Sequence, residues 1–256
     1  MGIVNATPDS FSDGGAHFDA PGALAHARSL RDAGADIIDV GGESTRPGAM
    51  PVPVEEELRR VMPVVETLSR EGAVVSVDTM KPEVMGAAID AGAAMVNDVN
   101  AFRADGAIEA VARSGVAVCA MHMQGTPATM QREPHYDDVV AEVAAYLRGR
   151  AKALEAAGIG ADRIVIDPGF GFGKTFAHNL ALFRALPALA AIGYALLAGL
   201  SRKKTIGDIT GRAVDDRVSG SVAAALLAVQ NGANLVRVHD VRETVDAIKV
   251  WMALGR

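Results

Sequence analysis

Short hydrophobic runs alternate with longer segments of helical periodicity along the whole chain. The runs are rich in Val, Ile, Ala and Leu, as expected for parallel strands buried on both faces. They predict eight strands, at residues 2–5, 36–40, 73–78, 95–98, 116–121, 163–167, 195–200 and 234–238. Eight strand–helix units over about 250 residues are typical of a (β/α)8 TIM barrel. We therefore predict one barrel domain over residues 1–256; a doubly wound open sheet is the alternative.

The segments between the strands carry recognisable helix boundaries. Glycines precede the next strand in AGAD at 33–36, REGA at 70–73, AGAA at 91–94, AAGI at 156–159 and NGAN at 231–234, where a helix C-terminus needs them. Val54, Leu58, Val61, Val65 and Leu68 follow a helical period. Pro63 lies inside that segment, so we expect a kink or a break there.

Composition narrows the class of protein. Half of the residues are hydrophobic, only 4% are aromatic, and the net charge is −6, which argues against binding to a nucleic-acid backbone. Cys119 is the only cysteine, so no disulfide forms within the chain and a reducing compartment is indicated. No apolar run reaches the length of a membrane span, and we expect a cytoplasmic protein.

Polar side chains stand at or just beyond the end of every predicted strand, where barrels build their active sites. They are Asn5, Asp39, Asp78, Asn97 with Asp98, His122, Asp167, Ser201 with Lys203, and Arg237 with His239. A single Asp in such a place is more often a helix cap than a catalytic group; Asp78 and Asp98 are open to that interpretation, and Asp240 is expected to be a cap outside the site. The whole set, with its cations and histidines, predicts a site.

The segment RIVIDPGFGFGKT at 163–175 ends like a nucleotide-binding loop, but its spacing is wrong. A P-loop requires Gly six residues before the Lys, and Pro168 stands there. The glycines also miss the dinucleotide fingerprint. What remains is a buried strand ending on Asp167, whose carboxylate needs hydrogen-bond donors. A flat, nitrogen-rich heterocycle would supply them, with Asn97 and Lys203 as further partners, while Arg237 and His239 stand where barrels bind phosphate.

Two loops rich in Gly, Pro and Ser follow the first two strands, at 7–15 and 41–53. Such loops act as lids or order a substrate beside the mouth of a barrel.

The motifs taken together resemble the dihydropteroate synthase family. The resemblance rests on NATPDSFSDGG at 5–15, DIIDVGGESTRPGA at 36–49, SVDTMKPEV at 76–84, NDV at 97–99, MHMQGTP at 121–127, DPGFGFGKT at 167–175, GLSRK at 199–203 and RVHDV at 237–241. It implies the joining of 6-hydroxymethyl-7,8-dihydropterin diphosphate to p-aminobenzoate, with release of pyrophosphate, and a homodimer.

The resemblance also implies roles for residues. Asp78, Asn97, Asp167 and Lys203 fall on the pterin-binding positions, and Arg237 and His239 on those that bind pyrophosphate. The p-aminobenzoate positions are Thr45, Arg46, Pro47, Phe172 and Ser201, and Asn5 is the implied Mg²⁺ ligand. We expect Asp78, Asp167, Lys203 and Arg237 to act in catalysis, the two carboxylates stabilising a cationic methylene on the pterin.

The motifs disfavour three other functions. A pterin-binding methyltransferase should lack TPDSFSDGG and STRPGA, and both are present. A non-catalytic relative should have lost Asn5, Arg237 or His239, and all three are present. A nucleotide-dependent enzyme is disfavoured by the spacing of GFGFGKT.

Overall fold

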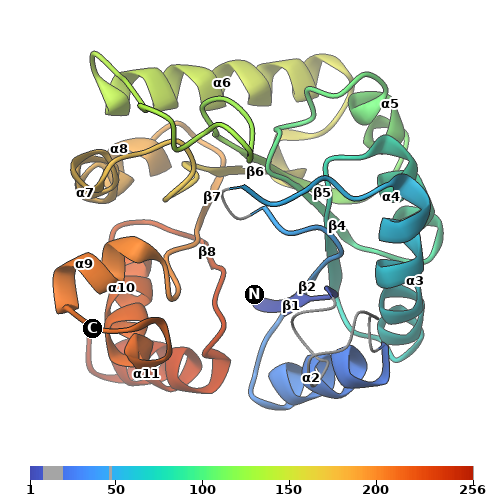
Figure 1. Cartoon of the computed structure of the whole chain (residues 1–256), viewed down its shortest axis with the longest axis horizontal. Helices are drawn as coiled ribbons and strands as arrows, with labels where there is room; N and C mark the ends of the chain where they lie inside the picture. The colour runs from blue at the N-terminus through green and yellow to red at the C-terminus, as the bar shows by residue number, and fades with distance from the viewer. Residues whose placement is uncertain (8–19, 46–47, 256) are drawn as a thin grey trace.

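The computed structural model describes residues 1–7, 20–45 and 48–255. Within them eight parallel strands are hydrogen-bonded in chain order, and Figure 1 shows helices surrounding them. The strands are β1 (Gly2–Asn5), β2 (Ile38–Gly41), β3 (Val75–Asp78), β4 (Met95–Asp98), β5 (Ala117–Met121), β6 (Ile164–Asp167), β7 (Ala195–Ala198) and β8 (Leu235–Val236). The predicted (β/α)8 barrel is confirmed.

The described helices lie between the strands in sequence. They are α2 (Ala20–Asp32), α3 (Val54–Arg70), α4 (Pro82–Asp90), α5 (Ala107–Ala112), α6 (Val139–Ala156), α7 (Phe176–Arg184), α8 (Leu186–Ala190), α9 (Lys204–Thr210), α10 (Val218–Gln230) and α11 (Val241–Leu254). The five glycines expected at helix ends all have positive φ, between 76° and 100°, so that prediction is confirmed.

The barrel closes between its last and first strands. The Val238 N–H donates to the Met1 carbonyl over 3.0 Å, and the Ile3 N–H donates to the Val238 carbonyl over 3.1 Å. Gly2 and Val238 form a parallel bridge. β8 is the shortest of the eight strands. Because its two residues pair only with β7 among the described strands, the bonds of Val238, two residues further on, join the two ends of the sheet.

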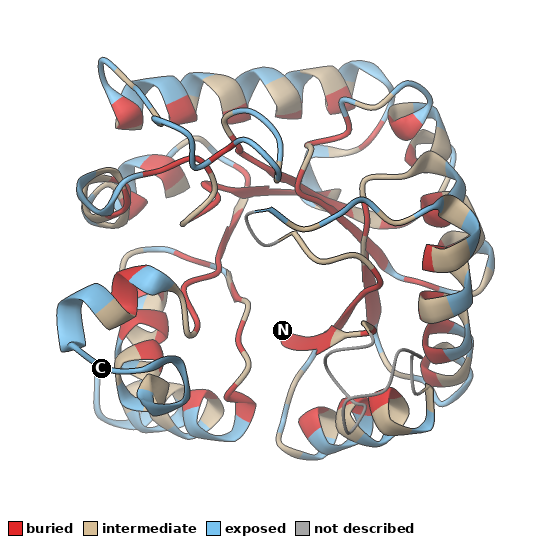
Figure 2. Ribbon diagram, in the orientation of Figure 1, coloured by how far each residue is buried: buried red, intermediate tan, exposed pale blue. Residues whose placement is uncertain are grey.

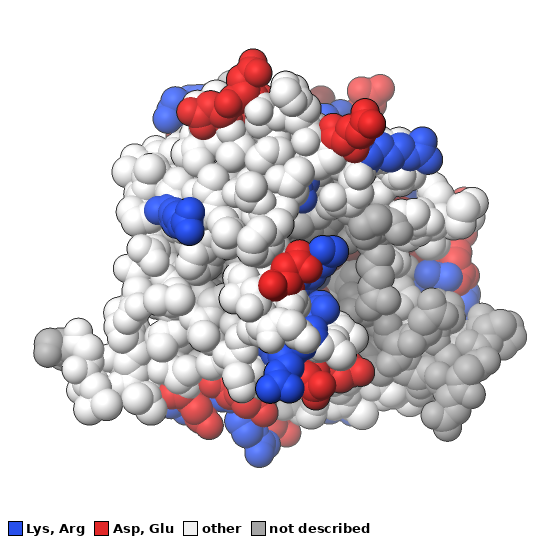
Figure 3. Space-filling model, turned by 60° about the vertical axis from the view of Figure 1, so that its left-hand side comes forward, with Lys and Arg blue, Asp and Glu red and all other residues white. Residues whose placement is uncertain are grey.

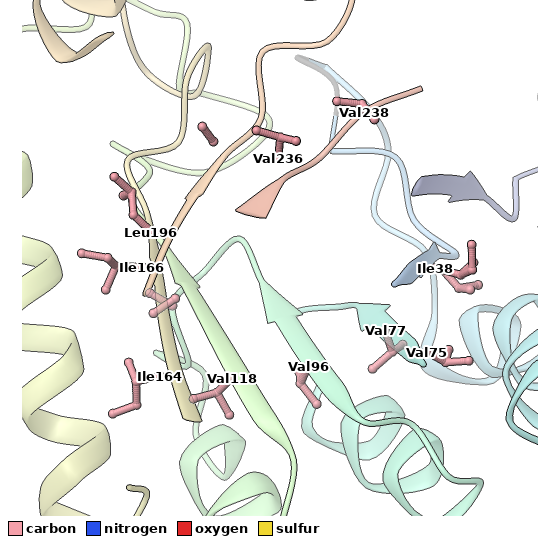
Figure 4. Close-up of a cluster of buried hydrophobic side chains, with 14 of the residues drawn as sticks. Ile38, Val75, Val77, Val96, Val118, Ile164, Ile166, Leu196, Val236 and Val238 are labelled. Carbon is pink, nitrogen blue, oxygen red and sulfur yellow. The ribbon is translucent and has the colours of Figure 1, made fainter. Parts of the chain in front are cut away.

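Side chains alternate between the two faces of the strands. One set, which includes Ile164, Ile166 and Leu196, points outward and packs against the helices (Figure 4). The buried surfaces of the helices face this layer (Figure 2). The other set points into the barrel, where Met95, Cys119, Val165 and Leu197 form an apolar layer.

The inward-facing positions change from apolar to polar along the strands. Two residues after Met95 comes Asn97, and two residues after Val165 comes Asp167. Because the period of a strand is two residues, both polar side chains lie above the apolar layer on the same face. The C-terminal mouth is therefore polar while the base of the barrel is largely apolar.

Three local predictions are corrected. The strands predicted at 36–40, 73–78, 195–200 and 234–238 are shorter or begin later than expected. Helix α3 runs without a break through Pro63, so a break there is wrong. Asp240 stands at the N-terminus of α11 but its carboxylate makes no capping bond; it pairs with Arg202 instead, at 2.5 Å.

The described surface is mixed in charge. Figure 3 shows acidic and basic side chains interspersed on one face. None of the helices within the described residues is long and apolar enough to span a membrane.

Candidate active site

The half-buried guanidinium of Arg237 joins two of the predicted strand-end carboxylates, and a third strand-end residue bonds one of them. Arg237 follows β8, and its Nε donates to Asp39 Oδ2 at 2.6 Å while its Nη2 donates to Asp78 Oδ2 at 2.8 Å. Asn97 Nδ2 donates to the same Asp39 oxygen at 3.2 Å. The result is a continuous network across β2, β3, β4 and the end of β8.

The charges in this network depend on one another. Burial lowers the pKa of Arg237, but the carboxylates of Asp39 and Asp78 outweigh burial and raise it. Burial raises the pKa of Asp78, and Arg237 opposes that change. Arg237 therefore stays charged, and its Nη1 donates to no acceptor among the described residues. That nitrogen remains able to donate to a ligand.

Asp167 and Lys203 form the other half of the polar mouth. Asp167 ends β6 and is 6% exposed; its Oδ1 accepts from the Gly169 N–H at 2.7 Å. Burial raises its pKa, and Lys203 opposes the shift. Burial lowers the pKa of Lys203 to about 8, against the attraction of Asp167. Within the described chain nothing donates to Asp167 Oδ2, so this oxygen can accept from a ligand.

Lys203 also reaches the loop that follows β6. Its Nζ donates to the Phe170 carbonyl at 2.5 Å and lies 4.7 Å from the centre of the Phe172 ring. Phe172 packs beside a small buried cluster that contains Met121, Met123 and Met130. An apolar wall therefore borders the ammonium group.

His239 and Ser201 lie together beside the network. His239 Nδ1 and Ser201 Oγ are 3.0 Å apart, and the His239 N–H donates to the same oxygen at 3.1 Å. Burial, with help from Arg237, lowers the pKa of His239 to about 4. The imidazole is neutral at pH 7.

The neighbouring basic residues have other partners. Lys204 pairs with Asp208 on the surface, at 2.7 Å, as a solvated face would, and Arg202 pairs with Asp240. Of the run 202–204, only Lys203 faces the mouth. Asp98 is a turn cap, because its two oxygens accept the N–H groups of Asn100 and Phe102 at 2.7 and 2.6 Å.

The second loop is anchored at its start. Lys81 bonds both Glu43, in that loop, and Glu57, which is fully buried in α3. Arg60 Nη1 donates to the Gly42 carbonyl at 2.9 Å. Thr45 lies two residues beyond Glu43 and hydrogen-bonds none of the other predicted site residues within the described segments. The predicted residues Arg46 and Pro47, and most of the loop at 7–15, lie outside the described residues.

Asn5 is the one predicted metal ligand. It ends β1 opposite Gly41, and within the described part of the chain its carboxamide makes no hydrogen bond. No group of three or more His, Cys, Asp or Glu side chains within the described residues is placed to hold a metal ion. A single oxygen donor fits Mg²⁺, which keeps several waters and binds substrate phosphates.

Asp39 stands at a strand end in the sequence, but the family resemblance implies no role for it. It is fully buried, and its Oδ1 has no partner within the described residues. The sequence does indicate a role, because Asp39 lies between Ile38 and Val40 in a buried strand. A buried strand tolerates such an acid only when a cation pairs with it. The cation, Arg237, lies 198 residues away in sequence.

Fold and mouth together define a (β/α)8-barrel enzyme with carboxylates, a guanidinium and an ammonium at its C-terminal face. Residues 1–239 match the model of the pterin binding enzyme family. The chain is 51% identical to the dihydropteroate synthase of Escherichia coli strain K12 over 251 residues, 98% of this chain and 89% of the relative.

Solved structures agree. A Xanthomonas albilineans dihydropteroate synthase with 4-aminobenzoic acid superposes with a TM-score of 0.94 at 58% identity, covering 100% of this chain and 92% of that one. The same enzyme in complex with 7,8-dihydropteroate gives a TM-score of 0.91 at 55% identity, with the same coverage of both chains. The chain belongs to the pterin-binding enzymes and, among them, to the dihydropteroate synthase family.

Proposed function

We propose that the chain joins 6-hydroxymethyl-7,8-dihydropterin diphosphate to p-aminobenzoate, releasing pyrophosphate and forming 7,8-dihydropteroate. It is a transferase of folate biosynthesis. The observation that carries the assignment of its site is the polar mouth, where Asn97, Asp167 and Lys203 stand above a largely apolar layer of the barrel interior. Residues 1–256 act as one domain.

The pterin ring binds between Asp167, Asn97 and Lys203. Asp167 Oδ2 accepts from the amino-pyrimidinone edge, Asn97 offers its amide, and Lys203 donates to the ring carbonyl. A carboxylate that is nearly buried gains more from such bonds than an exposed one. The ring thereby supplies the donors that the described residues leave missing.

The diphosphate binds at Arg237 and His239. Arg237 uses Nε and Nη2 for Asp39 and Asp78, so Nη1 donates to the phosphate oxygens as negative charge develops on the leaving group. One guanidinium thus connects the carboxylates beside the ring with the departing pyrophosphate. Asp78 and Asp167 stabilise the cationic methylene left on the pterin.

The p-aminobenzoate ring packs against Phe172, near Ser201 and the loop that carries Thr45, Arg46 and Pro47. Its arylamine is nucleophilic without a strong general base, so the chain needs to position the amine rather than deprotonate it. Mg²⁺ would be held by Asn5 and, when bound, would neutralise charge on the diphosphate.

The chain is further proposed to be a cytoplasmic homodimer. Cys119 is free and buried, consistent with a reducing compartment. Helices α10 and α11 expose Leu227, Val250, Met252 and Leu254, the last at 80%, and large apolar side chains gathered on two neighbouring helices suit an interface. Sedimentation of Val250→Asp against the unchanged protein tests this: the variant should be monomeric.

Pyrophosphate release with both substrates present tests the activity. We expect release that requires both substrates, falls by at least 10²-fold in Asp167→Ala, and is accompanied by 7,8-dihydropteroate in equal amount. Turnover of the diphosphate substrate without p-aminobenzoate would make the protein a hydrolase and refute the proposal.

A further inference from the structure

Lys174 is a buried lysine that the proposed reaction does not use, and burial lowers the pKa of its ammonium group to about 7. It belongs to GFGFGKT, the segment that imitates a phosphate loop, and is 3% exposed. Its Nζ lies 2.9 Å from His122 Nδ1, 2.8 Å from the Phe172 carbonyl and 3.3 Å from the His122 carbonyl. These contacts account for the three donors of an ammonium group. No carboxylate in the described part of the chain pairs with it.

The loop that Lys174 closes has little rigidity of its own. Gly169, Gly171 and Gly173 have φ of 66°, 81° and 61°, and glycine loses more conformational freedom on folding than other residues. The loop also presses on the chain after β5. A Cβ at Gly169 would lie 2.0 Å from the His122 carbonyl oxygen, and one at Gly173 would lie 2.8 Å from Gln124 Cβ. Fixing such a loop requires cross-links from outside.

Lys174 supplies one such cross-link, between the end of β5 and the tip of the loop. It donates to the carbonyls of His122, at the end of β5, and of Phe172, at the tip of the loop. Two further links hold the loop: Tyr136 donates to the Gly173 carbonyl at 2.8 Å, and the Gly171 N–H donates to Asn179 Oδ1 at 2.8 Å. Phe172 in turn faces Lys203 Nζ, which holds the Phe170 carbonyl. The position of the aromatic wall thus depends in part on Lys174, which alone among these links bonds the Phe172 carbonyl in the described chain.

The His122 ring is suited to accept a hydrogen bond from the lysine. Burial, and then Lys174, lower the pKa of His122 to about 3, so the imidazole is neutral at pH 7, and the amine 2.9 Å from Nδ1 favours the tautomer with its lone pair on that nitrogen. Tyr146 meets the ring edge-on with centroids 4.8 Å apart, which fixes its orientation. A methionine of similar length would leave this nitrogen and two carbonyls without their donor.

We propose that Lys174 is a positioning residue that latches the loop 168–174 to the end of β5 and thereby sets the affinity for the arylamine substrate. It acts through Phe172 and touches neither substrate. The inference rests on the proposed function in placing p-aminobenzoate beside Phe172. Pterin binding, which depends on Asp167 and Asn97, should be much less sensitive to it.

The test compares Lys174→Met with Lys152→Met, a surface control that is 67% exposed. In Lys174→Met we expect the KM for p-aminobenzoate to rise about tenfold, with kcat and the Kd for a bare pterin each within about threefold. Lys174→Gln keeps N–H donors and should show a smaller rise in KM. Three results would overturn the proposal: equal losses in pterin and p-aminobenzoate affinity, an unchanged KM for p-aminobenzoate, or failure of both Lys174→Met and Lys174→Gln to fold.

Hydrogen exchange separates the latch from the proposed reaction, because it needs no substrate. Amides 169–173 should exchange at least tenfold faster in Lys174→Met, while β4 and β6 keep their protection. Unchanged exchange would refute the latch even in an active enzyme. Wild-type protein without condensing activity, but with the expected exchange, would refute the proposed function and leave the latch standing.

Discussion

Replacement of Asp39 by Asn tests whether the network around Arg237 is built as described. The change keeps the size of the side chain and removes one of the two carboxylates that hold the guanidinium. Asp39 is fully buried, and its Oδ2 is 2.6 Å from Arg237 Nε. Loss of one partner of a buried ion pair costs about 3–5 kcal/mol.

The cost should be smaller here because Asp78 remains and Asn still offers an acceptor. A hydrogen bond to a charged group contributes about 1.5–3 kcal/mol, so we expect Asp39→Asn to lower the free energy of unfolding by about 2–3 kcal/mol. For a chain of this size that corresponds to about 5–10 °C in Tm. Asp32→Asn, on an exposed helix end, is the control and should change stability by less than about 0.5 kcal/mol.

The decisive measurement is calorimetric unfolding of Asp39→Asn, of Asp78→Asn and of the variant that carries both substitutions. The double variant leaves the half-buried guanidinium of Arg237 without a carboxylate in the network, so its loss should exceed the sum of the single losses by about 1 kcal/mol or more. Additive losses would show that Arg237 does not link the two acids. An unchanged Tm in Asp39→Asn would refute the network itself.

Three other outcomes are expected. Asn97→Ala should abolish pterin binding by calorimetry with little loss of Tm, and unchanged affinity would remove Asn97 from the pterin site. Binding of p-aminobenzoate should be weak to the free protein and strong once pterin, pyrophosphate and Mg²⁺ are present; equal affinity in both conditions would mean a preformed pocket. The pKa of His239 is lowered from 6.5 to about 4, so only the unfolded chain takes up this proton as the pH falls through that window, and stability drops by about 1.4 kcal/mol per pH unit. His239→Gln should lose less on acidification than the unchanged protein, and parallel stability curves would contradict the lowered pKa.

The barrel and the place of its site were predictable because both depend on local pattern. Apolar runs separated by amphipathic segments that end in glycine specify strand and helix in turn, and the C-terminal ends of parallel strands meet at one edge. Asp78, Asn97, Asp167, Lys203 and Arg237 were expected at this edge on that ground, and the structure places them there. Strand limits were less accurate, since β8 keeps only the residues that pair with β7.

The pairing within the site was not predictable, because it joins residues distant in sequence. Nothing near Asp240 in the sequence indicates that its carboxylate pairs with Arg202 and does not cap the helix. Nothing near Asp39 indicates that it pairs with Arg237. Pro63 failed as a helix breaker because α3 packs Val61, Val64 and Val65 into the core; this burial outweighs the lost backbone bond. Tertiary contacts decided each of these cases.

The link between Asp39 and Arg237 also sets an order on synthesis. The two residues are separated by 198 positions, which at about 5–20 residues per second takes roughly 10–40 s to traverse on the ribosome. Until Arg237 has been made, the nascent strands β2 and β3 bring two acids towards the same interior without their guanidinium partner. Early closure of a partial barrel is therefore penalised, and the substrate site comes into being only with the last strand.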